Sequence, residues 1–407
     1  MSGAGYGYRW VVLAVTFLVN CIAIGFTWMC LTPLLSSIMR DFQLSGGSAG
    51  LLLSSYVMAI AIVVIPAGMF ADRFGFKLGV SLGTVIIGVT GMLRGISSNF
   101  TQLFSLSLLT GVGMALIMPN LPKMVGEWFE REDFGLANGI VMAGMGVGNG
   151  LILMLVGTWF LPSFGWQTTF VIIGGLSLFT ALLWVILAKE RVGVKEAPHS
   201  HQTSSIPFRE GFLRIIRVRD LWLLIGIQFC ILGTFVGFLG FLHRMLEETK
   251  GMSGADASLA VSSIMLAAIV ANIVIPRLSD KVHRRKPFII IFGISTACSI
   301  YLIGILDGTI LWFLLSMLGF SLGAYTPLIF VIPLEMEGIG SELVGTASGL
   351  IFCIGNVGGA VVAPIAGTLI EASGSYGPST AMFVILALFI AIFNIPMRET
   401  GGNTEPS

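Results

Sequence analysis

Long apolar stretches alternate with short polar segments along the whole chain, and this pattern predicts helices that span a membrane. A helix that crosses the hydrocarbon core of a bilayer needs about 20 predominantly apolar residues. Twelve stretches meet this requirement, over residues 10–38, 46–70, 78–98, 101–126, 135–160, 166–188, 221–246, 256–278, 287–306, 309–332, 344–370 and 378–397. We therefore predict an all-α integral membrane protein with twelve transmembrane helices.

The longest polar stretch follows the sixth predicted helix and runs from Lys189 to Asp220. Its middle, residues 199–205, contains only His, Ser, Gln and Thr, and its end is rich in arginine. This composition is typical of a linker followed by an amphipathic segment on the membrane surface. The predicted organisation is an N-terminal six-helix bundle (residues 1–188), a cytoplasmic linker (189–220) and a C-terminal six-helix bundle (221–407).

The two predicted bundles repeat each other in sequence. Asp72 and Arg73 correspond to Asp280 and Lys281, at an offset of 208 residues. At an offset of 210, residues Gly135, Ala137, Gly139, Val147, Gly148, Gly157 and Thr158 recur as Gly345, Ala347, Gly349, Val357, Gly358, Gly367 and Thr368. Similar offsets at two separate places indicate a duplicated half, which is a hallmark of membrane transporters.

Composition excludes a water-soluble protein. Only 11% of the residues are charged and 55% are hydrophobic, whereas soluble domains carry about 25% charged residues. The net charge of +1 gives no argument for binding nucleic acid. The five cysteines lie inside apolar stretches without metal-ligand spacing, so we expect small buried residues, no metal and no cofactor. An enzyme is not expected either, because no stretch combines buried acids, histidines and nucleophiles.

The distribution of lysine and arginine predicts the orientation. With the N-terminus in the cytoplasm, eighteen of the 22 basic residues fall on the cytoplasmic side. The other four are Arg40, Arg94, Arg244 and Lys250. Basic residues accumulate in cytoplasmic loops of membrane proteins. We therefore predict that both termini and the linker are cytoplasmic, in a bacterial inner membrane.

The segment between the second and third predicted helices carries a recognisable motif. It keeps the Gly68, Asp72, Arg73, Gly75 and Lys77 positions of a Gly-x-Leu-(Ala)-Asp-Arg-x-Gly-Arg-Lys signature, with Phe76 in place of a basic residue. Together with twelve helices in a six-plus-six repeat, this segment resembles the major facilitator superfamily. The resemblance implies two pseudo-symmetric bundles, rocker-switch alternating access and a monomer.

The motif residues have physical reasons to be there. Gly68 and Gly75 permit a close helix approach and a tight turn. Asp72 lies at a helix end, where it can face a helix N-terminus and pair with a basic side chain. The resemblance implies that a cluster of these residues latches the two halves in one access state: Gly68, Asp72, Arg73, Gly75, Lys77, Asp280 and Arg284. Alternatively, Arg73 and Lys77 only anchor the chain to lipid headgroups.

Other stretches indicate which branches of the superfamily the chain resembles. Ser107 stands where drug/proton antiporters carry an arginine on helix 4, and their helix 5 proline is absent, which counts against proton-driven drug efflux. Three strings look like the cyanate/nitrate and organic-anion branches: residues 122–129, 135–139 and 333–338.

In this fold the substrate binds between the halves near mid-membrane. The membrane helices offer polar but uncharged side chains there, and our candidates are Trp28, Tyr56, Asn120, Asn149, Gln228, Tyr325 and Asn356. Each of them could instead tie neighbouring helices together. Glycines cluster on helix 5 at Gly144, Gly146, Gly148 and Gly150, and on helix 11 at Gly355, Gly358 and Gly359. The resemblance implies crossings between the halves there, and simple tight packing is the alternative.

Few charged residues fall inside the predicted helices. Arg94 lies about 25 Å beyond Lys77 at 1.5 Å per residue, near the membrane surface, so we expect it to snorkel. Lys123 and Arg244 lie near opposite helix ends and are candidates for a gate or for attracting an anion, and an interfacial anchor is the alternative.

The sequence favours a secondary transporter of a small organic solute or anion. The alternatives are an uncoupled facilitator and an exporter of amphipathic or cationic compounds. Because no acidic residue lies mid-membrane, we expect any coupling proton or ion to enter through the substrate or through a residue such as His243.

Overall fold

A computed structural model describes residues 3–189, 213–336, 339 and 343–400. The predicted linker lies mainly outside these residues, and so does the side chain of Asp72. The described ranges are helical and contain no strand. Eleven helices are long and apolar enough to cross a membrane in the described part of the chain. The prediction of an all-α membrane protein is confirmed.

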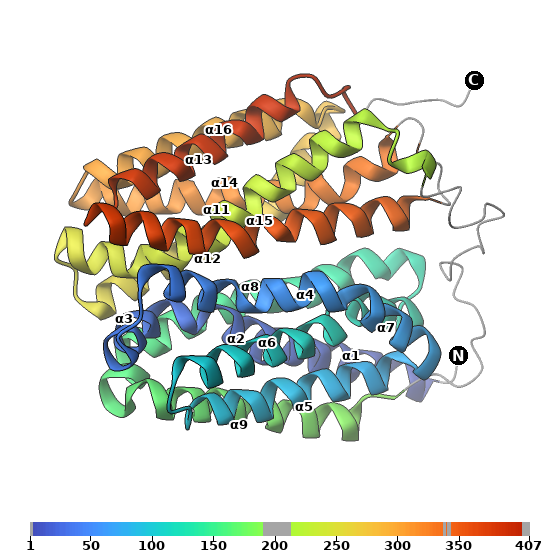
Figure 1. The fold of residues 1–407 in the computed structure, drawn as a ribbon. Helices are drawn as coiled ribbons and strands as arrows, with labels where there is room; N and C mark the ends of the chain where they lie inside the picture. The colour runs from blue at the N-terminus through green and yellow to red at the C-terminus, as the bar shows by residue number, and fades with distance from the viewer. Residues whose placement is uncertain (1–2, 190–212, 337–338, 340–342, 401–407) are drawn as a thin grey trace. The chain divides into compact units, whose positions relative to one another are not determined.

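The N-terminal half contains nine α-helical segments and two π-helical ones (Figure 1). They are α1 (Gly3–Leu18), η1 (Val19–Phe26), α2 (Thr27–Met29), α3 (Leu31–Phe42), α4 (Gly46–Phe74), α5 (Phe76–Arg94), α6 (Phe100–Ile117), α7 (Asn120–Trp128), α8 (Arg131–Leu155), η2 (Val156–Phe160) and α9 (Leu161–Leu187). Segments α1 to α3 together form the first predicted span, and α6 with α7 forms the fourth.

The described C-terminal half has simpler helices. They are α11 (Arg219–Lys250), α12 (Gly254–Val282), α13 (Lys286–Ile305), α14 (Thr309–Glu335), α15 (Val344–Ser373) and α16 (Gly377–Asn394). The two halves repeat their internal contacts. In one, α5 lies beside α6 and α9; in the other, α13 lies beside α14 and α16 (Figure 1).

The difference between twelve predicted and eleven observed spans has a local cause. Residues Asp133–Leu187 form one continuous helical stretch of 55 residues, which is too long for a single crossing. It contains the fifth and sixth predicted helices, which meet at Gly165 with φ of 73°. This conformation favours glycine and turns the chain between the two helices.

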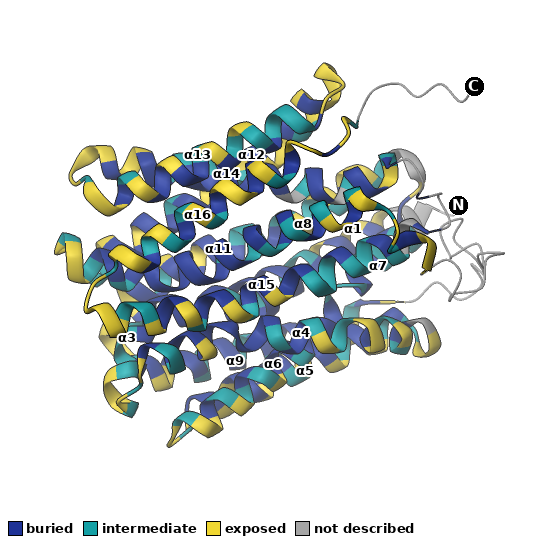
Figure 2. Cartoon of the chain, turned by 45° about the horizontal axis from the view of Figure 1, so that its top comes forward, coloured by how far each residue is buried: buried dark blue, intermediate teal, exposed yellow. Residues whose placement is uncertain are grey.

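The chain forms two compact units. Of the described residues, one unit contains 3–44, 51–189 and 246–262, and the other contains 45–50, 213–245, 263–336, 339 and 343–400. Within each unit, apolar residues of all sizes fill the interior, and large apolar residues also remain outside. Figure 2 shows exposed positions recurring along α5, α13 and α16. Exposed residues such as Ile186 and Ile291 fit a surface that faces lipid rather than water.

The cysteines follow the sequence prediction only in part. Cys21, Cys30 and Cys230 are buried, and Cys353 is half-buried. Cys298 on α13 is exposed, which corrects the expectation that all five are buried. The described residues contain no group of three or more His, Cys, Asp or Glu that could hold a metal ion.

Candidate functional site

The first membrane span changes its winding where it packs against α8. Its π-helical segment η1 contains Asn20 and Gly25. A Cβ on Gly148 of α8 would lie 2.1 Å from the Cys21 carbonyl oxygen, so the two backbones touch there. A Cβ on Gly25 would lie 2.8 Å from the Met145 oxygen. Such π segments are rare and occur often at functional sites.

Polar amides lie on both sides of this contact. The Asn20 side chain donates to the Val141 carbonyl at 2.6 Å and ties η1 to α8. Asn149 is 4% exposed, and its side-chain oxygen has no hydrogen-bond partner among the described residues. Trp28 lies two residues after the end of η1, in α2, and is half-buried. Two of the predicted substrate residues, Trp28 and Asn149, therefore lie on adjacent elements.

The C-terminal half repeats this arrangement between α11 and α15. A Cβ on Gly358 would lie 2.1 Å from the Phe229 carbonyl oxygen, and one on Gly355 would lie 2.3 Å from Cγ of Gln228. Gln228 is 8% exposed. Asn356 is buried and donates to the Phe352 carbonyl of its own helix at 2.5 Å. Gln228 and Asn356 therefore lie at one helix–helix contact.

These contacts change the interpretation of the glycine clusters. We expected Gly144, Gly148, Gly355 and Gly358 at crossings between the halves or in simple tight packing. The structure packs Gly144 against Phe17 and Gly148 against Cys21, within the N-terminal half. At these four glycines the geometry supports tight packing inside each half, since no Cβ fits between the backbones. Gly150 of the same cluster accepts a hydrogen bond from Ser262 of α12 at 3.1 Å.

Tyr325 does not fit its predicted place in the cavity. Its ring on α14 is fully buried. Its hydroxyl donates to the Phe292 carbonyl at 2.7 Å and lies 2.6 Å from the Thr296 hydroxyl, both on α13. The side chain therefore ties two helices of one half together.

Asn120 has a similar packing role. It is fully buried, and its amide nitrogen donates to the Leu116 carbonyl at 2.7 Å. A Cβ on Gly79 of α5 would lie 2.8 Å from that nitrogen. Asn120 thus faces α5, and this contact does not fit the predicted cavity-lining role.

Arg94 is the largest departure from the sequence prediction. It is fully buried instead of snorkelling to the surface. Its Nη1 donates to the hydroxyl of Tyr56, which is 2% exposed. The guanidinium also lies 4.5 Å from the ring centre of Phe170. Tyr56, predicted to line the cavity, thus contacts an arginine inside the N-terminal half.

The motif loop of the N-terminal half is built around a glycine turn. Gly75 has φ of 89° between α4 and α5, which favours glycine. A Cβ on Gly68, in contrast, would meet nothing within 4 Å, so the expected close helix approach does not occur there. The Arg73 side chain is exposed and lies 5.4 Å from the Phe74 ring. The Lys77 carbonyl accepts a hydrogen bond from Trp184 at 3.2 Å.

The corresponding loop of the C-terminal half contains an ion-pair cluster centred on Arg285. This side chain is 7% exposed and contacts the Asp280 carboxylate at 2.5 Å and the Glu335 carboxylate at 2.8 Å. The hydrogen bond with Glu335, and then that with Asp280, raises the pKa of Arg285. The cluster joins the ends of α12 and α14 to the start of α13.

A third carboxylate completes this cluster. Glu399 accepts hydrogen bonds from the backbone nitrogens of Arg285 at 2.7 Å and Lys286 at 3.0 Å. A carboxylate at a helix N-terminus satisfies otherwise unpaired N–H groups and favours the helix dipole. The end of the chain is thereby attached to the start of α13.

The sequence prediction chose Arg284 for this latch, and the structure corrects it. Arg284 is exposed, whereas its neighbour Arg285 holds the carboxylates. Glu335 and Glu399 were missed as partners. A signal existed for Glu335, because it is an acidic residue at the end of a predicted helix on the strongly basic side of the membrane.

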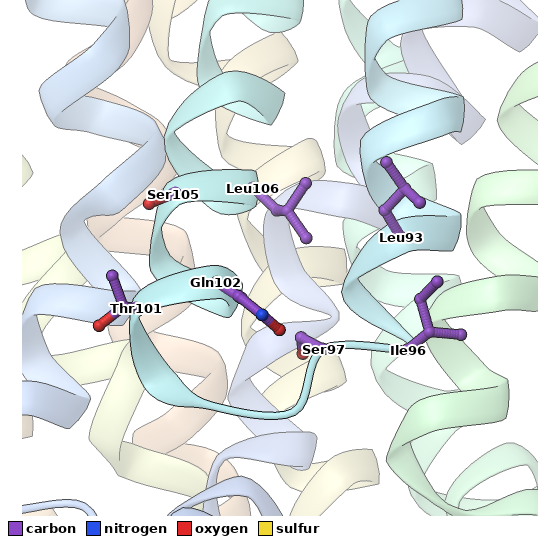
Figure 3. Close-up of a pocket in the computed structure, with 7 residues that line it drawn as sticks. All are labelled: Leu93, Ile96, Ser97, Thr101, Gln102, Ser105 and Leu106. Atoms are coloured by element: carbon purple, nitrogen blue, oxygen red, sulfur yellow. The ribbon is translucent and has the colours of Figure 1, made fainter.

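The candidate gate residues lie near helix ends. Lys123 on α7 and Arg244 on α11 are both half-buried. A hollow of about 400 Å³ lies at the turn between α5 and α6 (Figure 3). It is lined by Leu93, Ile96, Ser97, Thr101, Gln102, Ser105 and Leu106, none of which titrates. This open, uncharged hollow shows no chemistry of its own.

The family model of the Major Facilitator Superfamily matches residues 16–363. The chain belongs to this superfamily. A crystal structure of a bacterial homologue of the human lysosomal transporter Spinster, in an inward-facing and unoccupied conformation, has the same fold. The TM-score is 0.79 at 17% identity, over 95% of this chain and 96% of that one.

Two relatives in this superfamily are similar in sequence over most of their length. The probable sulfoacetate transporter SauU of Cupriavidus necator is 25% identical over 83% of this chain and 82% of its own. The probable galactarate/D-glucarate transporter GudP of Bacillus subtilis is 24% identical over 92% of this chain and 88% of its own. This Major Facilitator Superfamily chain is therefore an integral membrane transporter of a small molecule and not an enzyme.

Proposed function

We propose that this protein is a secondary transporter of small organic anions that works by alternating access. The proposal rests on the substrates for which similar proteins are named. SauU and GudP, which it matches over most of its length, are named as transporters of sulfoacetate and of galactarate and D-glucarate. All of these are small anions with carboxylate or sulfonate groups.

We propose two groups of substrate-binding residues, each within its own half. Trp28 and Asn149 lie beside η1 in the N-terminal half, and Gln228 and Asn356 lie where α11 meets α15. Amide N–H groups donate to carboxylate oxygens, and an indole ring covers the apolar part of a small solute. Lys123 and Arg244 would draw anions toward the helix ends.

The motif loops would control the exchange between access states. In the N-terminal loop we assign this role to Asp72, Arg73, Gly75 and Lys77. In the C-terminal loop, Asp280 acts together with Arg285 and Glu335, which are held at 2.5 and 2.8 Å. The excess of lysine and arginine on this side supports cytoplasmic termini and a bacterial inner membrane. We propose a monomer as the working unit.

Uncoupled facilitation is a second candidate with an observation of its own. In the described membrane spans, acidic residues occur only near the ends, as Glu127, Asp256, Glu335 and Glu371 do. A buried carboxylate that could carry a proton is absent from the middle of these spans. A transporter of this kind would let its substrate equilibrate unless the substrate itself carries the proton.

Uptake by purified protein in liposomes tests both candidates. Labelled sulfoacetate and D-glucarate are the probes, with an uncharged sugar and a quaternary amine as controls. We expect saturable uptake of at least one anion and none of the controls. Uptake of the amine alone would contradict the proposal and support an exporter of cations. Accumulation above the external concentration in a pH gradient would indicate coupling, and equilibration would indicate a facilitator.

A further inference from the structure

Arg94 is a buried cation without a counter-ion among the described residues. It is the last residue of α5 and has no exposed surface. An arginine stays protonated in proteins, and burying an unpaired charge is costly. Asp41 does not supply the missing charge, because it is exposed and accepts from the Trp166 indole at 2.6 Å. Something else must balance this charge.

The contacts of Arg94 come from three other segments. Tyr56 of α4 accepts from Nη1, the Phe170 ring of α9 lies 4.5 Å from the guanidinium, and the Cys30 sulfur lies close by. Sulfur is a weak acceptor, and an aromatic ring compensates only part of a full charge. The Ser107 hydroxyl of α6 is also buried and lies within reach of the Tyr56 hydroxyl.

The unpaired nitrogens of Arg94 share one edge of the guanidinium. Nη1 is used by Tyr56, whereas Nε and Nη2 are buried and have no partner in the described ranges. These two N–H groups are parallel and form the fork that binds the two oxygens of a carboxylate. A Cβ on Gly91 would lie 3.8 Å from Nη2, an ordinary van der Waals contact, so Gly91 lies beside this edge.

We propose that Arg94, with Tyr56 and Ser107, binds the carboxylate or sulfonate group of the transported anion. The proposal rests on the proposed function and adds to it the residue that recognises the negative charge. Arg94 would provide two parallel N–H donors, and the Ser107 hydroxyl a further donor. Because the site is closed in this structure, the anion reaches it only when α4 and α6 separate locally.

Two variants and one control test this site. Arg94→Gln removes the charge and the fork, and Arg94→Lys keeps the charge without the fork. Arg40→Gln is the matched control, because Arg40 is an exposed arginine in the same half. We measure the melting temperature of purified protein with sodium sulfoacetate, D-glucarate or chloride at constant ionic strength. Uptake of the two organic anions in liposomes gives KM.

We expect the organic anion that the protein transports to raise the melting temperature of the wild type and of Arg40→Gln, but not of Arg94→Gln. Loss of a charge-assisted fork should raise KM about tenfold or more in Arg94→Gln, with a smaller rise in Arg94→Lys. Without anion, Arg94→Gln should be no less stable than the wild type, since an unpaired buried charge is removed. If Arg94→Gln does not fold, Arg94→Lys and Tyr56→Phe provide the same KM comparison.

Three outcomes would overturn the inference. An unchanged KM and melting response in Arg94→Gln would make Arg94 a structural cation, while uptake by the wild type would leave the proposed function intact. A response to chloride that depends on Arg94, with none to the organic anions, would assign the site to inorganic anions. Wild-type protein that neither binds nor transports any organic anion would instead contradict the proposed function itself.

Discussion

At the scale of single residues, Arg285 and Arg94 differ in whether a carboxylate pairs with the buried guanidinium. Both arginines are buried, but Arg285 contacts Asp280 and Glu335 at 2.5 and 2.8 Å, whereas Arg94 contacts a phenol and an aromatic ring. A buried cation with carboxylate partners is satisfied by the protein itself. The difference indicates a structural or latching role for Arg285 and a ligand-binding role for Arg94.

Removing one carboxylate from the Arg285 cluster should destabilise the protein. Glu335→Gln leaves Arg285 paired with Asp280 alone, and Glu335 is partly exposed, so we expect a loss of about 1–2 kcal/mol. The raised pKa of Arg285 means that its charge contributes at every pH below its unfolded value and is lost only as the pH rises through the higher folded value. Thermal unfolding of both proteins at pH 7 measures the difference.

The exposed neighbour provides the control for that measurement. Arg284→Gln should leave the free energy of unfolding within about 0.5 kcal/mol of the wild-type value, as surface substitutions usually do. Equal losses in Glu335→Gln and Arg284→Gln would show that the loop as a whole, and not the Arg285 cluster, determines stability.

A substitution of Tyr325 tests whether this residue ties α14 to α13 instead of lining the cavity. Tyr325→Phe keeps the buried ring and removes the hydroxyl that links α14 to Phe292 and Thr296 of α13. We expect a loss of about 1 kcal/mol in stability, the usual value for one buried hydrogen bond. The KM for the transported anion should not change, because the ring does not contact it. A large rise in KM with unchanged stability would restore the cavity-lining role.

These corrections share one physical cause. The length of an apolar stretch predicts that a helix spans the membrane, and residue spacing predicts the depth of each side chain. Rotation about the helix axis was not predictable, because helices that are apolar on all sides have no polar stripe to mark an inward face. Arg94 and Tyr325 were therefore assigned to the wrong surroundings, although the helices that carry them were predicted correctly.

At the scale of helices, the duplicated glycines mark equivalent contacts. Gly148 of α8 touches the first membrane span at Cys21, and Gly358 of α15 touches α11 at Phe229. The two glycines are 210 residues apart and so are repeat partners. The repeat was visible in the sequence, but the partner helix of each glycine became visible only from the backbone distances.

Alanine at these glycines should destabilise each half. In Gly148→Ala or Gly358→Ala the new Cβ would lie about 2.1 Å from a carbonyl oxygen, so the helices must separate. Overpacking of this kind costs about 1–3 kcal/mol. Thermal unfolding in detergent and uptake in liposomes should both decrease.

Repeat-related glycines on the same helices serve as matched controls. A Cβ on Gly139 of α8 or Gly349 of α15 would meet nothing within 4 Å. Alanine there should be neutral or stabilising by up to about 1 kcal/mol, because it favours the helix more than glycine does. Equal destabilisation by all four variants would show that helix flexibility, and not the close contact, is what matters.

Breaks within helices were the hardest elements to predict. The first span appeared as one apolar stretch, yet it contains η1 between Val19 and Phe26. No residue type marks a π segment, which differs from an α-helix only in its i→i+5 hydrogen bonds. Here it lies where the span packs against α8. The turn at Gly165 was easier, since a glycine there separates two stretches that are each long enough to span.

At the scale of the whole molecule, the two motif loops predict how access is controlled. The sequence places Asp72 and Asp280 at equivalent positions, and the structure shows Asp280 in an ion pair with Arg285. We expect Asp72→Asn to insert and fold normally and to shift the population between access states. Cysteines introduced at the two mouths, labelled by an impermeant maleimide, measure this shift. Unchanged labelling together with unchanged uptake would make Asp72 an ordinary loop residue.

The whole-molecule charge distribution also predicts how a proton gradient acts on transport. Acidic residues lie only near the ends of the described spans, so we expect the substrate to carry any coupled proton. A carboxylate can be protonated at mildly acidic pH, whereas a sulfonate remains ionised. An inward proton gradient across liposomes should therefore accelerate uptake of a carboxylate substrate and leave that of a sulfonate of similar size unchanged. Equal acceleration of both would mean that a protein group carries the proton. His243, which is buried in α11, would then be the residue to replace with glutamine, and loss of the acceleration in that variant would identify it as the carrier.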